Sequence, residues 1–195
     1  MSTKFYSPAT IALCGAWIWA LFSDSVADDP RVAIPVSVAL ITATLVAARH
    51  VQVRQIDLGS AAQVMCAITL ALVMFTFWGL AISSFPMITV PESFPEALRL
   101  LPLFLTGPLL AVLTALLFAY PLTVLLPRHH WLVPVLAALL VGLVQYDMMS
   151  DPDGRLLTRA VMSLEVASLA ILGPVVVGFF GRRIRGSGSL AGGAA

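Results

Sequence analysis

The sequence lacks asparagine altogether and contains a single lysine, Lys4, although its formal net charge is only +1. Without asparagine there is no Asn-x-Ser/Thr acceptor for N-glycosylation. The other ten basic residues are all arginine. A chain rich in Ala, Leu, Val and Arg and poor in Lys and Asn is typical of a GC-rich prokaryotic genome, so we expect a bacterial protein.

Charge of either sign is also scarce. Only 11% of the residues are charged and 59% are hydrophobic, against about 25% and 45–50% in an average soluble domain. A soluble fold of 195 residues cannot bury that much apolar surface, whereas lipid accepts it as long as the backbone satisfies its own hydrogen bonds in helices. The composition therefore predicts an all-α integral membrane protein with one transmembrane domain, residues 1–185.

Six apolar stretches are long enough, or nearly so, to cross a membrane, which takes about 20 residues per helix. The expected spans are 9–26, 32–48, 61–85, 98–126, 131–149 and 160–181. The fourth is longer than a bilayer requires and contains three prolines, so we expect a kink or an interruption near Thr106-Gly107-Pro108. The sequence thus predicts a six-helix bundle with short loops.

The arginines orient this bundle. With both termini in the cytoplasm, seven Lys and Arg residues lie inside and four lie outside, the bias expected of an inner membrane protein. The inner set is Lys4, Arg49, Arg54, Arg128, Arg182, Arg183 and Arg185, and the outer set is Arg31, Arg99, Arg155 and Arg159. Residues 186–195 have the composition of a flexible tail or a vector-derived linker.

Small residues spaced four apart mark faces where helices can approach closely. Two such faces are Ala12, Ala16 and Ala20 in the first span and Ala39, Ala43 and Ala47 in the second. They predict packing within the chain or against a protein partner or second copy. With six spans and a small-residue face on the first, the chain resembles, in size and general pattern, the six-helix substrate-binding subunits of vitamin importers. No motif accompanies that resemblance, so it assigns no residue.

Residues 35–40 and 134–139 share four of six positions, and each segment opens a span. Two halves of three spans each would then form an inverted repeat, as in many transporters. The alternative is ordinary, because proline is common in a first helical turn. The sequence leaves both possibilities open.

Glu165 is the one acid that we expect well inside a span, about one and a half turns from Arg159. An ionisable group at such a depth is a functional candidate, for example in a proton or cation path. The alternative is a carboxyl group that reaches the outer interface or hydrogen-bonds to Ser163, Ser168 or a neighbouring helix.

Gln145, Tyr146 and Asp147 end the fifth span on the same outer side, where they would shape a polar vestibule or serve as interfacial anchors. Together with Thr106, Gly107 and Pro108 of the fourth span, Arg159 and Glu165 they make up the candidate substrate or ion path.

Motifs for metals and cofactors are missing, and we expect neither. Cys14 and Cys66 lie in apolar runs, where we interpret them as small buried hydrophobes, with a disulfide or metal pair as the alternative. His50, His129 and His130 fall in inner loops, where a haem between helices could not use them. We interpret them as interfacial anchors.

No catalytic motif was found, so we do not expect an enzyme. Three functions remain: a transporter, permease or membrane subunit of a transport complex; a non-catalytic scaffold or assembly subunit; and a lipid-handling enzyme. The last depends only on acids of the outer loops, which are Asp28, Asp29, Asp151 and Asp153. The expected partners are membrane lipids and protein, not nucleic acid.

The topology makes a testable prediction at Gly154, in the turn between the fifth and sixth spans. With both termini in the cytoplasm, a reporter enzyme fused after Gly154 reads as periplasmic, and one fused after Arg185 reads as cytoplasmic. A cytoplasmic reading at Gly154 contradicts the six-span topology.

Overall fold

The computed structural model of the chain describes residues 8–23, 29–83, 105–148 and 156–191 and a few positions between 95 and 102, side chains at several helix ends excepted. Its regular structure in these residues consists of helices. They are α1 (Pro8–Leu21), α3 (Pro30–Val53), α4 (Ser60–Ser83), α6 (Thr106–Leu125), α7 (Leu132–Met148) and α8 (Leu156–Ala191).

Four of these helices are long and apolar enough to cross a membrane: α3, α4, α6 and the Met162–Ile184 part of α8. The apolar parts of α1 and α7 are shorter. At 1.5 Å per residue, the 20 residues of α6 span about 30 Å, the thickness of a bilayer core. The all-helical prediction is confirmed, and the arrangement is compatible with a helical membrane bundle. Six crossings and the orientation of the termini stay predictions.

The helices differ in length from the spans expected from hydropathy. The second span was expected to stop at residue 48, but α3 continues through the exposed residues Arg49 and His50 to Val53. Similarly, α8 runs to Ala191, through most of the segment expected to be a flexible tail. A charged residue ends an apolar stretch but leaves the backbone hydrogen bonds of a helix intact. For this reason α3 and α8 extend beyond the ends of the expected spans. α6 begins at Thr106, where we expected an interruption.

A C-terminal cap turns α3 toward α4. Gln55 has a positive φ of 50°, its N–H donates to the carbonyl of Gln52, and the N–H of Ile56 donates to the carbonyl of Val51. This is the Schellman pattern, in which the left-handed position is usually glycine. It stops α3 and lets α4 begin at Ser60.

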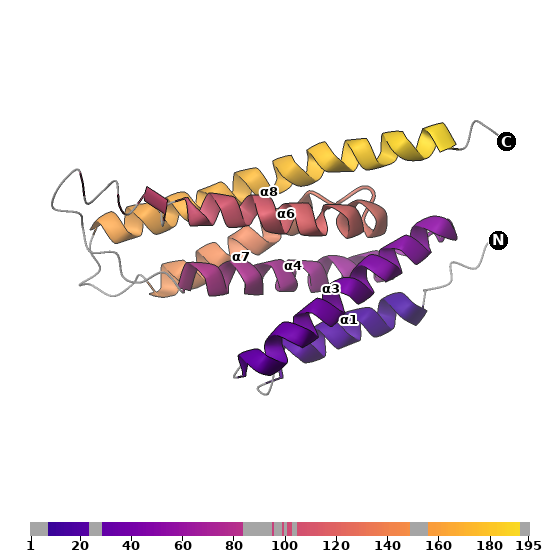
Figure 1. Cartoon of the computed structure of the whole chain (residues 1–195), viewed down its shortest axis with the longest axis horizontal. Helices are drawn as coiled ribbons and strands as arrows, with labels where there is room; N and C mark the ends of the chain where they lie inside the picture. Colours follow the sequence, from indigo (N-terminus) through magenta and orange to yellow (C-terminus); the bar gives the residue numbers. More distant parts are fainter. Residues whose placement is uncertain are drawn as a thin grey trace.

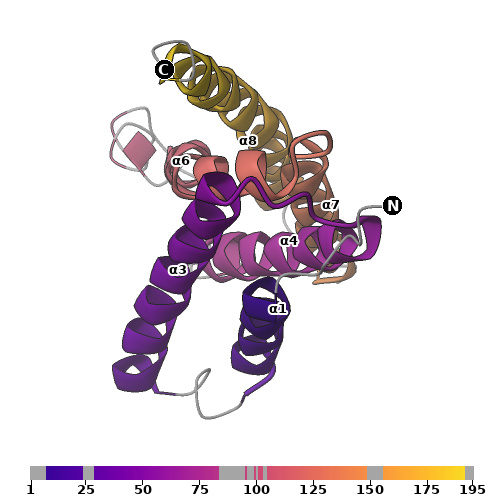
Figure 2. The ribbon, with the colours of Figure 1, turned by 90° about the vertical axis from the view of Figure 1, so that its right-hand side faces the viewer.

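α6 and α8 lie side by side along the bundle (Figures 1 and 2). A Cβ atom added at Gly107 of α6 would lie 3.0 Å from the Cγ of Glu165, and one added at Gly181 of α8 would lie 2.5 Å from the Cγ2 of Thr123. The two contacts are separated by 16 residues on α6, from Gly107 to Thr123, and by the same 16 residues on α8, from Glu165 to Gly181. The two helices are therefore parallel and in register over about 24 Å.

Trp78 of α4 joins the central helices. It is fully buried, and its indole Nε1–H donates to the hydroxyl of Thr114 on α6, which itself donates to the carbonyl of Leu110 at 2.7 Å. A Cβ atom added at Gly173 of α8 would meet both the Trp78 ring, at 3.1 Å, and Pro134 of α7, at 3.0 Å. One side chain thus contacts α6 and sits where α7 and α8 meet.

α1 and α3 form the edge of the bundle, where they diverge from each other (Figure 2). The Nε1–H of Trp17 on α1 donates to the hydroxyl of Thr44 on α3 at 2.7 Å. The hydroxyl of Tyr120 on α6 donates to the side-chain oxygen of Gln52 on α3, also at 2.7 Å. Interhelical hydrogen bonds therefore hold α3, which has only four buried residues.

The small-residue faces of α1 and α3 are divided between the inside and the outside of the bundle. Ala20 and Ala47 are buried, and the other four alanines are exposed: Ala12, Ala16, Ala39 and Ala43. The two segments of the possible repeat also differ, because Pro35 is exposed and Pro134 is buried.

Replacing Thr114 by valine tests the role of Trp78. Thr114→Val keeps the shape but removes the acceptor, which leaves a buried indole N–H without a partner. We expect a loss of about 1–2 kcal/mol, measured as a lower thermal unfolding temperature in detergent. The control is Thr42→Val on α3, where the exposed hydroxyl donates to the carbonyl of Val38 in its own helix. Equal stability of the two variants contradicts the role given to this bond.

Candidate functional site

Glu165 is one of the few buried polar residues, with 4% of its surface exposed. Its Oε1 atom is buried and has no hydrogen-bond partner in the described part of the chain. The hydroxyl of Ser168 donates to the backbone carbonyl of Glu165, at 2.7 Å, and not to its carboxyl group. The carboxyl oxygen therefore lacks the intrahelical bond to Ser168 that we considered as an alternative.

The side chain of Glu165 faces the first turn of α6. Its Cγ and Cδ atoms would lie 3.0 and 3.2 Å from a Cβ atom at Gly107, so only glycine allows the two helices to come this close without a shift. Gly107 is buried, whereas Thr106 and Pro108 are half-buried. The hydroxyl of Thr106 donates to the carbonyl of Pro102 at 3.0 Å. Of the three candidates in the fourth span, Gly107 is the one in close contact with Glu165.

Glu165 lies at the level of the first turn of α6, because its side chain meets Gly107, the second residue of that helix. The end of α8 nearer Glu165 lies opposite the end where α1 begins and α8 finishes (Figure 1). The carboxyl group is therefore close to one end of the bundle, at the depth of the first turn of α6, rather than at its middle.

Two opposing influences act on this carboxyl group. Burial among apolar atoms disfavours its charged form. The first turn of a helix carries a partial positive charge that favours an anion, and the N-cap residue of α6, Leu105, makes no side-chain hydrogen bond there. A carboxyl group placed between these influences is suited to bind and release a proton or a small cation.

A groove of about 420 Å³ lies on another side of α8, between α7 and α8. Its polar lining includes Gln145 and Tyr146 of α7 and Ser163 of α8; Gln145 is 5% exposed. Glu165 does not line this groove. The groove with Gln145 and Tyr146 thus lies along one face of α8, and Glu165 projects from another face of the same helix. Asp147 is exposed, and the side chain of Arg159 lies outside the described residues.

In the part of the chain that the structure describes, the other acids and the histidines do not gather into a group of metal ligands. The carboxylate of Asp29 caps α3 by accepting from the N–H of Arg31 at 2.8 Å, while Asp28, Asp151 and Asp153 lie outside the described residues. No group of three His, Cys, Asp or Glu residues that could hold a metal occurs within the ranges described above.

Tertiary structure adds one pair that the sequence left as an alternative. The Sγ atoms of Cys14 on α1 and Cys66 on α4 are 3.9 Å apart. The two residues are 52 positions apart, so no local signal could have paired them. The Gly107–Glu165 contact had only a weak signal, a Gly-Pro pair inside an overlong span.

Comparisons with protein-family models, curated proteins and solved structures gave no match for this chain.

The contact of Gly107 with Glu165 predicts a coupling between the two positions. In Gly107→Ala the new methyl group presses on Cγ and Cδ of Glu165, and we expect a loss of about 1–2 kcal/mol of stability relative to Gly79→Ala. Gly79 has no atom within 4 Å of the position of its Cβ, so this control shows the effect of alanine on the helix alone.

In the background Glu165→Ala, which lacks Cγ and Cδ but keeps the Cβ atom at 3.2 Å, part of the loss disappears. The measurement is a double-mutant cycle on thermal unfolding in detergent, with an expected coupling of about 1 kcal/mol. Strictly additive changes contradict the contact.

Proposed function

We propose that this chain is a small multi-pass transporter or permease, or the membrane subunit of a transport complex, of a bacterial inner membrane. Its termini are cytoplasmic, and Glu165 binds the proton or cation whose movement accompanies transport. The observation that carries the proposal is the buried carboxyl group of Glu165, one oxygen of which lacks a partner among the described residues.

Burying a carboxyl group lowers the stability of the fold, and this cost is the reason for assigning Glu165 a functional role. A carboxyl group in an apolar helix interface destabilises the fold compared with an apolar residue of similar size. Ionisable residues inside apolar segments are for this reason rare and usually functional. Gly107 supports this assignment, because its lack of a side chain leaves room for the carboxyl group at the start of α6.

The groove between α7 and α8 is the best candidate for a cargo vestibule. It combines a mostly apolar wall with the polar groups of Gln145, Tyr146 and Ser163, a composition typical of sites for small molecules. Since α8 carries Glu165 on one face and this groove on another, a shift of α8 would affect both. That connection is the basis for coupling an ion to the cargo.

A second candidate function, a scaffold or assembly subunit, is favoured by one observation. Ala12, Ala16, Ala39 and Ala43 face outward, and nothing lies within 4 Å of the Cβ position of Gly15 between them. Such faces suit close packing against a helix of another protein or a second copy. The lipid-handling enzyme has no comparable support: of the four acids on which it depends, the structure describes only Asp29, which is engaged as a helix cap.

Ion flux into proteoliposomes tests the proposed transporter. The purified chain is reconstituted with a pH-sensitive dye inside, and a potassium diffusion potential drives proton entry; a parallel set holds a sodium-sensitive dye. We expect one of the two ions to enter severalfold faster than in empty liposomes, and Glu165→Gln to return the rate to that of empty liposomes. Asp57→Asn, which changes an exposed acid between α3 and α4, serves as the control and keeps the flux.

The outcomes separate the candidates. Flux that is equal in the wild type and Glu165→Gln removes Glu165 from the path. No flux in either set, together with a protein that co-purifies in stoichiometric amount and is lost in Ala16→Leu but not in Ala160→Leu, replaces the transporter with the scaffold. Ala160 is an exposed alanine on α8.

A further inference from the structure

Two cysteines meet in the interface of α1 and α4, remote from Glu165. Cys14 is 4% exposed and Cys66 is 2% exposed; both are free thiols, and their Sγ atoms are 3.9 Å apart. Cys14 lies between two spaces. On one side is a cavity of about 10 Å³ that it shares with Cys66, and on the other is a groove of about 240 Å³ that opens between α1 and α4.

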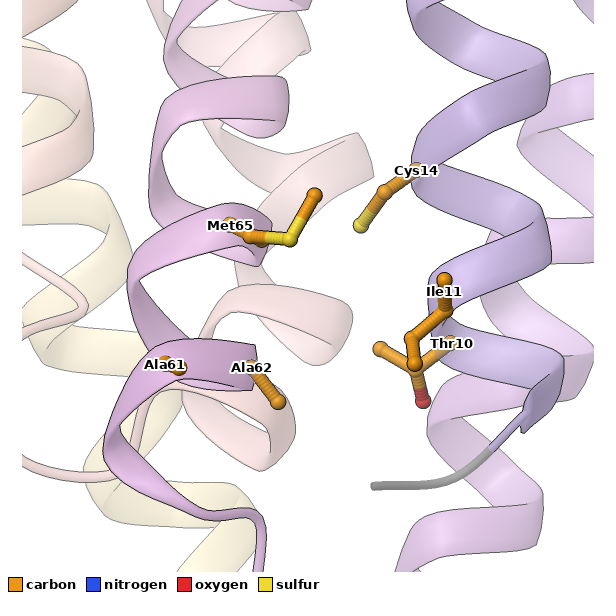
Figure 3. A pocket seen from close by; sticks show the side chains of 6 residues that line it. All are labelled: Thr10, Ile11, Cys14, Ala61, Ala62 and Met65. Carbon is orange, nitrogen blue, oxygen red and sulfur yellow. The ribbon is translucent and has the colours of Figure 1, made fainter.

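A third sulfur atom, that of Met65, faces Cys14 (Figure 3). Met65 of α4 lines the groove together with Cys14, and Figure 3 shows the Met65 side chain and the Cys14 thiol pointing toward each other across the gap between the helices. Met65 is 44% exposed, so its flexible thioether can move. Cys14 and Met65 line the groove, and Cys66 lies on the other side of Cys14, in the small cavity.

Two hydroxyl groups at the same place lack partners. Thr10 and Thr69 are each 2% exposed, and neither Oγ1 atom has a hydrogen-bond partner in the described residues. Thr10 lines the groove beside Cys14, and Thr69 lines the small cavity with both cysteines. An unpaired hydroxyl inside an apolar interface is costly, so two of them beside a thiol pair indicate a polar or charged species that they would contact.

We propose that Cys14, Cys66 and Met65 form a binding site for a copper(I) ion, with the two Sγ atoms and the Met65 thioether sulfur as ligands. Thiolate and thioether ligands select soft ions such as copper(I), and a thioether distinguishes copper(I) from zinc, which takes thiolate, imidazole and carboxylate ligands. No histidine or carboxylate lines either space.

The separation of the thiols fits this geometry. Metal–thiolate bonds are about 2.3 Å long, so two sulfurs of a trigonal site, at about 120° to each other, lie about 4.0 Å apart. The Sγ atoms are 3.9 Å apart as they stand. A disulfide bond requires about 2.05 Å, so the two thiols would have to approach each other, whereas two thiolate ligands of a trigonal site stay where they are and only the flexible Met65 side chain turns toward the ion.

Binding balances without a redox step. The two thiols each lose a proton to water and become thiolates, copper keeps its +1 charge, and the resulting complex carries a net charge of −1. Thr10, which lines the groove beside Cys14, and Thr69, which lines the small cavity with both cysteines, can donate hydrogen bonds that stabilise this charge. The site involves neither Glu165 nor the groove between α7 and α8, so its test does not depend on whether the chain is a transporter.

Competition with a chromophoric copper(I) chelator tests the site. The full-length protein, reduced and in detergent, is titrated with copper(I) under anaerobic conditions. We expect one copper(I) per chain, loss of that binding in Cys14→Ala and in Cys66→Ala, and at least tenfold weaker binding in Met65→Leu. Met162→Leu is the matched control, because Met162 lines the groove between α7 and α8, and it binds as the wild type does.

X-ray absorption of the wild-type complex gives a second measurement that does not depend on the variants folding. Three sulfur ligands at about 2.3 Å support the site, and nitrogen or oxygen ligands overturn it. The proposal is also overturned by a reduced wild type that leaves all copper with the chelator, or by Cys14→Ala binding copper like the wild type. A pair that oxidises readily to a disulfide but takes no copper once reduced is a redox pair, which likewise overturns the metal site.

Discussion

The buried indole of Trp78 is the constraint on which the rest of the bundle depends. In an apolar interior an N–H group must find an acceptor within the protein, and Trp78 finds it in Thr114 of α6. Its ring also lies against the position where a Cβ of Gly173 on α8 would be, next to Pro134 of α7. Satisfying one donor therefore fixes α4 against α6 and places α7 and α8 around the same side chain.

The register of α6 and α8 builds on this arrangement. Glycine at one contact on each helix, Gly107 and Gly181, lets the two axes approach closely at both ends of a parallel pair. Close approach is the main source of affinity between helices in lipid, where the hydrophobic effect does not bring them together. The same approach encloses the Glu165 carboxyl group, so the packing that stabilises the pair also creates its one costly residue.

Unpartnered polar atoms coincide with the places where we infer ligands. Among the described residues, three buried side-chain oxygens lack a hydrogen-bond partner, on Thr10, Thr69 and Glu165. Glu165 is the proposed proton or cation site, and the two threonines flank the thiol pair. Elsewhere the buried hydroxyls of Thr44, Thr114 and Thr123 donate to carbonyls of their own helices. Because most buried polar groups of a protein are hydrogen-bonded, the three oxygens without a partner are expected to contact a ligand.

The sequence by itself determined the helical class, the approximate position of each helix and the identity of the buried acid as a candidate. These follow from one-dimensional properties: apolar length, the scarcity of charge and the position of prolines. Hydropathy did not indicate where α3 and α8 end as helices, because backbone hydrogen bonding continues past the last apolar residue of each expected span. Only the tertiary structure decided which residues meet. It brought Gly107 to Glu165 and Cys14 to Cys66, and it placed the acid outside the groove that Gln145 lines. It also turned two of the three alanines of each small-residue face outward, because such contacts depend on how each helix is rotated and which helices are neighbours.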